Sequence, residues 1–165
     1  MNPRIKWLRN QLIPLKLDGI IVSNPINVRY LTGLTEEGTL IIAPKENVFI
    51  TDGRYIESVN HKLTIDDEII AYDSRELTKY DYEGFFMLDE NVGFEESYLT
   101  YEKYKKYLHT YQVNLIETEG ILENQRIVKD EEEYNPIKKA CEITDKAFEY
   151  IIRNIKKGMT EKEVA

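Results

Sequence analysis

Hydrophobic positions in the first part of the chain occur either in short continuous runs or at spacings of three and four. Continuous runs are typical of strands covered on both faces, and the wider spacings are typical of amphipathic helices. Runs at 19–22, 68–72, 92–95 and 113–116 predict strands, 39–42 and 48–50 predict a hairpin, and helices are expected at 5–15, 25–32, after 53 and at 101–108. This alternation predicts an α/β fold, a mixed sheet flanked by helices.

Turn and capping residues fix several of these boundaries. Asn24 followed by Pro25 is a typical helix start, and Gly33 stands where a left-handed C-terminal cap belongs. Pro14 is expected to end the first helix early. The segment 43–47 has turn chemistry between the two hairpin strands.

The pattern changes at Asp130, where the spacings of three and four continue without a break and predict one long helix to about residue 156. Its start resembles a capping box with Glu133, and Pro136 costs one hydrogen bond. We therefore predict a domain over 1–125, followed by a linker and helix over 126–165. The helix carries an apolar stripe, through which we expect the chain to self-associate; it consists of Tyr134, Ile137, Cys141, Phe148, Ile151 and Ile155.

The formal net charge is -8, and all of the excess lies in residues 1–125, which hold 13 basic and 21 acidic side chains. An acidic surface repels phosphate backbones and anionic lipid, so we expect neither nucleic acid nor a membrane as partner. The single cysteine offers no intramolecular disulfide, and the first residues lack the apolar core of a signal peptide. These features predict a cytoplasmic protein.

Motifs for catalysis or metal binding are missing. The glycines form no dinucleotide or P-loop pattern, and His61, His109 and Cys141 have no zinc-site spacing. The acidic pairs and runs are typical of solvated faces and helix starts. We predict no catalytic residue, no metal ligand and no cofactor within the chain itself.

Two polar clusters follow predicted strands and are candidates for binding. Each combines a short polar side chain with an arginine and a tyrosine, and they comprise Asn27, Arg29 and Tyr30 in one and Asp52, Arg54 and Tyr55 in the other. We expect the clusters to converge at one edge of the sheet, with Arg29 or Arg54 paired to Asp52. The alternative is structural, with Asp52 capping the next helix and pairing with an arginine, and with the tyrosines in half-buried positions.

The segments 17–33, 51–55, 92–95, 126–133 and 157–164 together resemble the amino-terminal domain of the creatinase, prolidase and aminopeptidase P family. The resemblance implies a ribonuclease H-like architecture and a parent enzyme that is an Xaa-Pro dipeptidase or aminopeptidase. It implies two divalent ions of the manganese, cobalt or zinc type in that parent. Their ligands, two aspartates, a histidine and two glutamates, are expected beyond Ala165, so the chain is expected to stop shortly after the catalytic domain begins.

The resemblance also implies how the chain contributes to the parent. The domain packs on its own catalytic domain and on a second subunit of a homodimer, and the loop 34–38 faces the neighbouring subunit's active site, where a proline-containing peptide binds. Glu36 and Glu37 in that loop depart from the pattern of many relatives. Two alternatives are a noncatalytic peptide-binding or chaperone-like module, and the amino-terminal domain of a creatinase-like amidinohydrolase.

Overall fold

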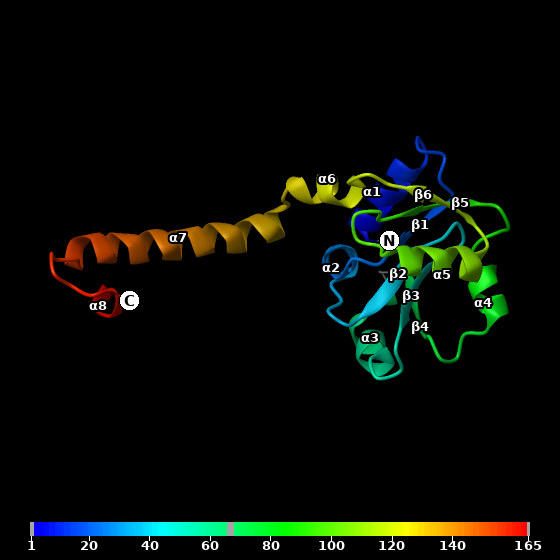
Figure 1. Cartoon of the computed structure of the whole chain (residues 1–165), viewed down its shortest axis with the longest axis horizontal. Coiled ribbons are helices and arrows are strands. Elements are labelled where there is room, and N and C mark those ends of the chain that lie inside the picture. Colours follow the sequence, from blue (N-terminus) through cyan, green and yellow to red (C-terminus); the bar gives the residue numbers. More distant parts are fainter. Residues whose placement is uncertain (1, 66–67, 165) are drawn as a thin grey trace. The chain divides into compact units, whose positions relative to one another are not determined.

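The fold is organised around a six-stranded mixed sheet with strand order β4-β3-β2-β1-β5-β6 (Figure 1). This computed structural model describes residues 2–65 and 68–164. The strands are β1 (Gly19–Val22), β2 (Gly38–Ile42), β3 (Asn47–Thr51), β4 (Ile69–Asp73), β5 (Asn91–Phe94) and β6 (Asn114–Glu117). The chain divides into two units, Met1–Arg126 and Ile127–Ala165, and the whole sheet lies in the first.

Strand β1 is central, and both pairing modes meet on it. It pairs antiparallel with β2, with Ile21 opposite Ile41, and parallel with β5, with Ile20 opposite Gly93. β2 and β3 form the predicted antiparallel hairpin, and β4 and β6 add parallel edges. The mixed sheet and the central, fully buried β1 are therefore confirmed.

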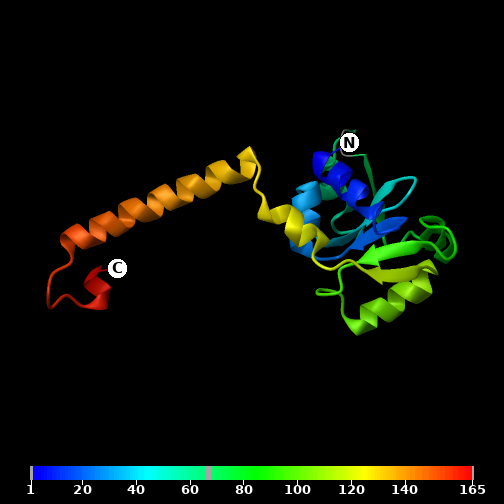
Figure 2. The same cartoon turned by 90° about the horizontal axis from the view of Figure 1, so that it is seen from above.

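Helices cover both faces of this sheet. One face packs on α1 (Pro3–Leu12), α2 (Pro25–Thr32), α3 (Ile56–Lys62) and α6 (Ile121–Ile127), and the other packs on α4 (Lys79–Gly84) and α5 (Tyr101–Tyr111). Figure 2 shows α1 and α5 on opposite sides of the sheet. Along β1, Ile20 and Val22 enter the first core and Ile21 the second, as the period of two in a strand requires.

The predicted helix boundaries hold where capping chemistry was visible. The Asn24 side chain accepts from the Ile26 amide, Pro25 takes the first helical position, and Gly33 ends α2 with φ 75°. α1 ends at Leu12, before Pro14. Two helices, α4 and α6, were not predicted, because each is short and has few apolar positions at helical spacing.

The second unit contains α7 (Glu131–Asn154) and the short α8 (Glu161–Val164). The predicted capping box at Asp130 is present: its carboxylate accepts from the Glu133 amide at 2.9 Å, and the Glu133 carboxylate accepts from the Asp130 amide at 3.2 Å. Pro136 lies inside the helix. No residue of α7 is buried, so its apolar stripe is open to solvent.

Candidate functional site

A groove of about 650 Å³ lies in the first unit, on the sheet face that carries α4 and α5. Its walls come from the starts of β2 and α4, the end of β3, and one side of α5. Apolar and aromatic side chains line it, including Ile50, Tyr82, Tyr107 and Tyr111. Three of the predicted site residues, Glu37, Asp52 and Arg54, lie on its rim.

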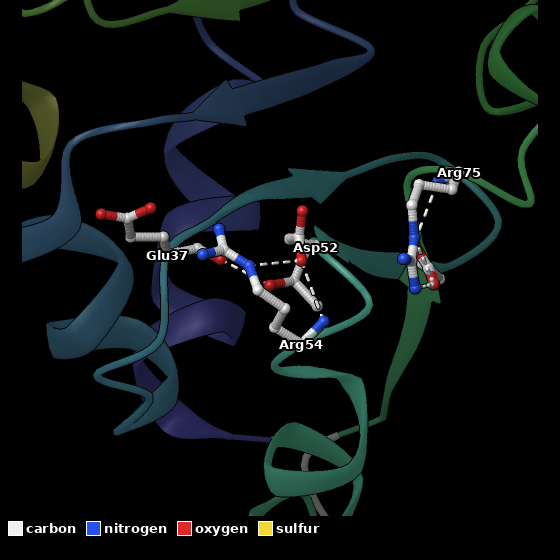
Figure 3. A network of polar contacts seen from close by, with 6 residues as sticks. Glu37, Asp52, Arg54 and Arg75 are labelled. Atoms are coloured by element: carbon white, nitrogen blue, oxygen red, sulfur yellow. Dashed lines mark hydrogen bonds and ion pairs between the residues drawn. The ribbon is translucent and has the colours of Figure 1, made fainter.

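The Asp52–Arg54 pair forms one side of this groove, and the expected pairing of Asp52 with an arginine is confirmed. The Arg54 Nε donates to Asp52 Oδ1 at 2.8 Å, and the Arg54 amide donates to the same oxygen at 2.9 Å. These two donors lower the pKa of the Asp52 carboxyl below its usual value, the backbone contact contributing most. Figure 3 shows the Arg54 side chain lying across Asp52 toward Glu37.

The glycine between these two residues leaves space for a neighbouring ion pair. A Cβ at Gly53 would overlap the Arg75 guanidinium and the Asp73 carboxylate, which form an ion pair of 2.7 Å. Figure 3 shows Arg75 apart from Arg54, on the other side of Asp52. The Asp-Gly-Arg sequence therefore lets two arginine–aspartate pairs occupy neighbouring turns.

The loop between α2 and β2 is fixed by Glu36. Its carboxylate accepts from Lys62 Nζ at 2.6 Å and from Ser58 Oγ at 2.6 Å, both on α3, and only 8% of its side chain is exposed. The contact from Lys62, followed by that from Ser58, lowers the pKa of Glu36 to about 2. Glu37 is exposed, while its backbone carbonyl accepts from the Thr51 hydroxyl.

Asn27 lies in a different place from the rim residues. It is 0% exposed and its amide nitrogen donates to Glu95 Oε1 at 2.7 Å and to Glu123 Oε1 at 2.8 Å. Its amide oxygen accepts from Arg126 at 3.1 Å. Asn27, on α2, thus joins Glu95, which directly follows β5, to α6, and as a buried bridge it is not a surface for ligand contact.

The carboxylate at the centre of this network is Glu95, which is 7% exposed. Besides Asn27, it accepts from the Ser23 amide at 2.6 Å and the Asn24 amide at 2.8 Å. Burial raises the pKa of Glu95 although these donors oppose the shift. Sequence reasoning missed this role, and the available signal was a carboxylate directly after the buried run 92–94.

Of the other three predicted residues, the two tyrosines occupy structural positions. Arg29 is exposed on α2. The Tyr30 ring packs under the Arg4 guanidinium, 4.2 Å from its centroid, and Tyr55 packs against the first core. The half-buried tyrosines therefore fit the structural alternative.

We expected the two clusters to converge, but no hydrogen bond joins them among the described residues. The network around Asn27 reaches Glu95, Glu123 and Arg126, whereas the Asp52–Arg54 pair faces the groove. The structural alternative needs a correction as well. α3 is N-capped by Tyr55 with no side-chain cap bond. Asp52 lies three residues before this cap, and its Oδ1 accepts from Arg54 instead.

Two lysines of the groove were also missed. Lys103 and Lys106 stand one turn apart on α5 and line the groove. The available signal was the alternation of basic residues with tyrosines in this helix. The helical spacing of the tyrosines was instead interpreted as packing onto the sheet.

The residues that the structure describes, 2–65 and 68–164, contain no group of three or more His, Cys, Asp or Glu side chains placed to hold a metal ion. Across the same ranges, no helix combines the length and the apolar character that a membrane span needs.

A mixed sheet with helices on both faces, followed by a long helix, defines a class of fold that solved structures share. An Xaa-Pro dipeptidase from Bacillus anthracis is 32% identical with a TM-score of 0.77, over 98% of this chain and 45% of that one. The N-terminal domain of the cytoplasmic peptidase PepQ from Mycobacterium tuberculosis matches with a TM-score of 0.63, over 75% of this chain and 98% of that one.

Residues 4–128 match the family model of the creatinase/prolidase N-terminal domain, and the chain belongs to that family. An uncharacterized peptidase of Bacillus subtilis is 31% identical over 98% of this chain and 46% of its own length. The Xaa-Pro dipeptidase of Pyrococcus furiosus is 27% identical over the whole chain and 46% of its own length. The chain thus spans about half the length of the curated relatives it matches.

Proposed function

We propose that this chain is the non-catalytic amino-terminal part of a metal-dependent Xaa-Pro peptidase, acting in the cytoplasm. The observation that carries the proposal is the family match over residues 4–128, together with full-length relatives named as Xaa-Pro dipeptidases, of which the chain spans 46%. In this proposal, a second half supplies the two divalent ions and the chemistry. The chain contributes to assembly of a homodimer and to substrate access at the neighbouring subunit's metal site.

The loop 34–38 is the part that the proposal assigns to substrate access. Glu36 ties the loop to Lys62 on α3, so the loop keeps a fixed position at the start of β2. The neighbouring Glu37 is exposed on the groove rim and faces solvent without such a tie. A carboxylate in that position suits contact with the amino end of a peptide.

Steady-state kinetics of the full-length protein on Xaa-Pro dipeptides test the proposal. Glu37→Ala and Glu36→Ala should raise KM several-fold and leave kcat within about twofold, as loss of binding common to the ground and transition states does. Glu119→Ala removes an exposed carboxylate elsewhere and serves as the control. Unchanged kinetics in both loop variants would remove the loop from substrate access. An absence of Xaa-Pro hydrolysis with manganese, cobalt or zinc would refute the peptidase assignment itself.

A further inference from the structure

The groove between α4, α5 and the sheet has features that the proposed role in assembly and access does not use. Its volume of about 650 Å³ lies within the usual range for small-molecule sites, which are concave, mostly apolar and carry a few placed polar groups. All of its lining residues belong to the first unit. It is therefore complete within this chain.

The charge of the groove is opposite to that of the domain around it. Four Lys or Arg side chains line it, Arg54, Lys79, Lys103 and Lys106, against the two carboxylates of Glu37 and Asp52. Residues 1–125 as a whole hold 21 acidic and 13 basic side chains. A cationic hollow on an acidic domain concentrates anions at that one place.

The positive charge is located on α5. Asp52 is paired with Arg54 at 2.8 Å, so these two charges largely compensate one another. Lys79 pairs with Glu83 at 3.3 Å. Within residues 2–65 and 68–164, Lys103 and Lys106 form no ion pair, which leaves two ammonium groups one helical turn apart facing the groove.

The floor next to these lysines offers aromatic surface and hydroxyl groups. The Tyr107 and Tyr111 rings pack edge to face with their centroids 5.6 Å apart, and the Tyr82 and Tyr111 centroids are 5.9 Å apart. The Tyr107 hydroxyl lies 2.9 Å from Ser23 Oγ and 3.4 Å from Thr39 Oγ1, so its position is fixed by two partners. Rigid aromatic walls suit a flat or branched apolar body.

We propose that this groove binds a small organic anion, with an aromatic or aliphatic body on the tyrosine floor and its charged group between Lys103 and Lys106. The anionic group is a carboxylate or a phosphate, since both accept from two ammonium groups. This binding is independent of the peptidase assignment, because every group it uses is in the first unit.

Titration calorimetry on the 165-residue protein tests the proposal with three matched probes: phenylacetate, phenyl phosphate and the neutral phenylacetamide. At least one of the two anions should bind with one-to-one stoichiometry and at least about fivefold more tightly than the amide. The anion that binds more tightly shows whether the groove prefers a carboxylate or a phosphate. The preference should shrink as salt is raised, because the contact is electrostatic.

Two variants locate the binding. Lys103→Gln/Lys106→Gln should weaken binding of the preferred anion about tenfold. Lys105→Gln, which removes one positive charge from the same helix at a position beside Tyr101 and outside the groove lining, should leave that binding unchanged. Both variants change exposed side chains, and a urea midpoint within error of the parent confirms that the fold is kept. Equal affinity for amide and anions, or equal weakening by Lys105→Gln, overturns the proposal, as does the absence of binding by both anions.

Discussion

Replacing Asn27 by alanine tests whether the buried bridge between β1, β5 and α6 stabilises the domain. The change removes the donor to Glu95 Oε1 at 2.7 Å, the donor to Glu123 Oε1 at 2.8 Å and the acceptor for Arg126. Glu95 is only 7% exposed, so water does not readily replace the lost contact. The remaining amide donors of Ser23 and Asn24 bind only Oε2.

The expected loss follows from these contacts. A buried polar group left without its partner costs about 1–3 kcal/mol, and more when it is charged. Because water can partly replace the hydrogen bond that Glu123 loses, we expect the free energy of unfolding to fall by about 3 kcal/mol. This is a large share of the roughly 5–15 kcal/mol that stabilises a typical domain. At a urea dependence of about 1.5 kcal/mol per molar, the midpoint should fall by about 2 M.

Urea unfolding followed by the fluorescence of Trp7 measures this loss in the first unit, because Trp7 is the single tryptophan and lies on α1. Asn60→Ala, at an exposed position of α3, is the matched control. It should change the free energy of unfolding by less than about 0.5 kcal/mol. A loss from Asn27→Ala no larger than that of the control would refute the bridge as a stabilising element.

Asn27→Asp sharpens the same test. It keeps the shape but places a third carboxylate within hydrogen-bond distance of Glu95 and Glu123. Like charges at this distance disfavour ionisation, so the variant should be less stable than Asn27→Ala at pH 7 and recover as the pH falls. A variant equally unstable at pH 7 and pH 4 would contradict the electrostatic part of the reasoning.

Two further predictions concern acid stability and association. The pKa of Glu36 is lowered to about 2, so its ion pair with Lys62 stabilises the fold above pH 4.5 and is lost as the pH falls from 4.5 toward 2; the midpoint difference between the parent and Glu36→Gln should therefore shrink over that range, while Glu119→Gln shows none. The open apolar stripe of α7 should drive self-association of the 165-residue protein, and truncation at residue 128 should abolish it. Sedimentation showing a concentration-independent monomer would contradict this second expectation.

The sequence predicted the elements whose signals are local. Asn24, Pro25 and Gly33 each carry a backbone preference that needs no partner. The apolar runs also predicted strands, whether buried along their length, as in β1, or largely exposed at the edge, as in β6. The short helices α4 and α6 lacked such a signal: α4 depends on a capping box between Thr78 and Asp81, and α6 contributes only Leu122 as a buried residue.

The site was harder to predict because its geometry depends on contacts between distant residues. The pairing of Asp52 with Arg54 spans two residues and was foreseeable. The partners of Asn27 lie 68 and 96 residues away, and nothing local distinguishes an amide that binds a ligand from one that bridges a buried and an exposed carboxylate. Lys103 and Lys106 on α5 could not be predicted as site residues, because the groove that they line is formed together with β2, β3 and α4.

The mixed pairing on β1 has a consequence for the order in which the domain assembles. The β2–β3 hairpin closes over a few residues, whereas β1 and β5 pair across about 70 residues, and this longer closure costs about 2 kcal/mol more chain entropy. Because the entropy of a long closure is lost before its contacts are gained, we expect the β1–β5 pairing to form after the hairpin and after the main folding barrier. Glu95 joins the ends of β1 and β5 through its hydrogen bonds to Ser23 and Asn24, and Asn27 holds Glu95 in place. Asn27→Ala should therefore speed unfolding and leave the folding rate nearly unchanged in stopped-flow experiments. The bridge would then govern how long the folded domain survives, while the hairpin governs how quickly it forms.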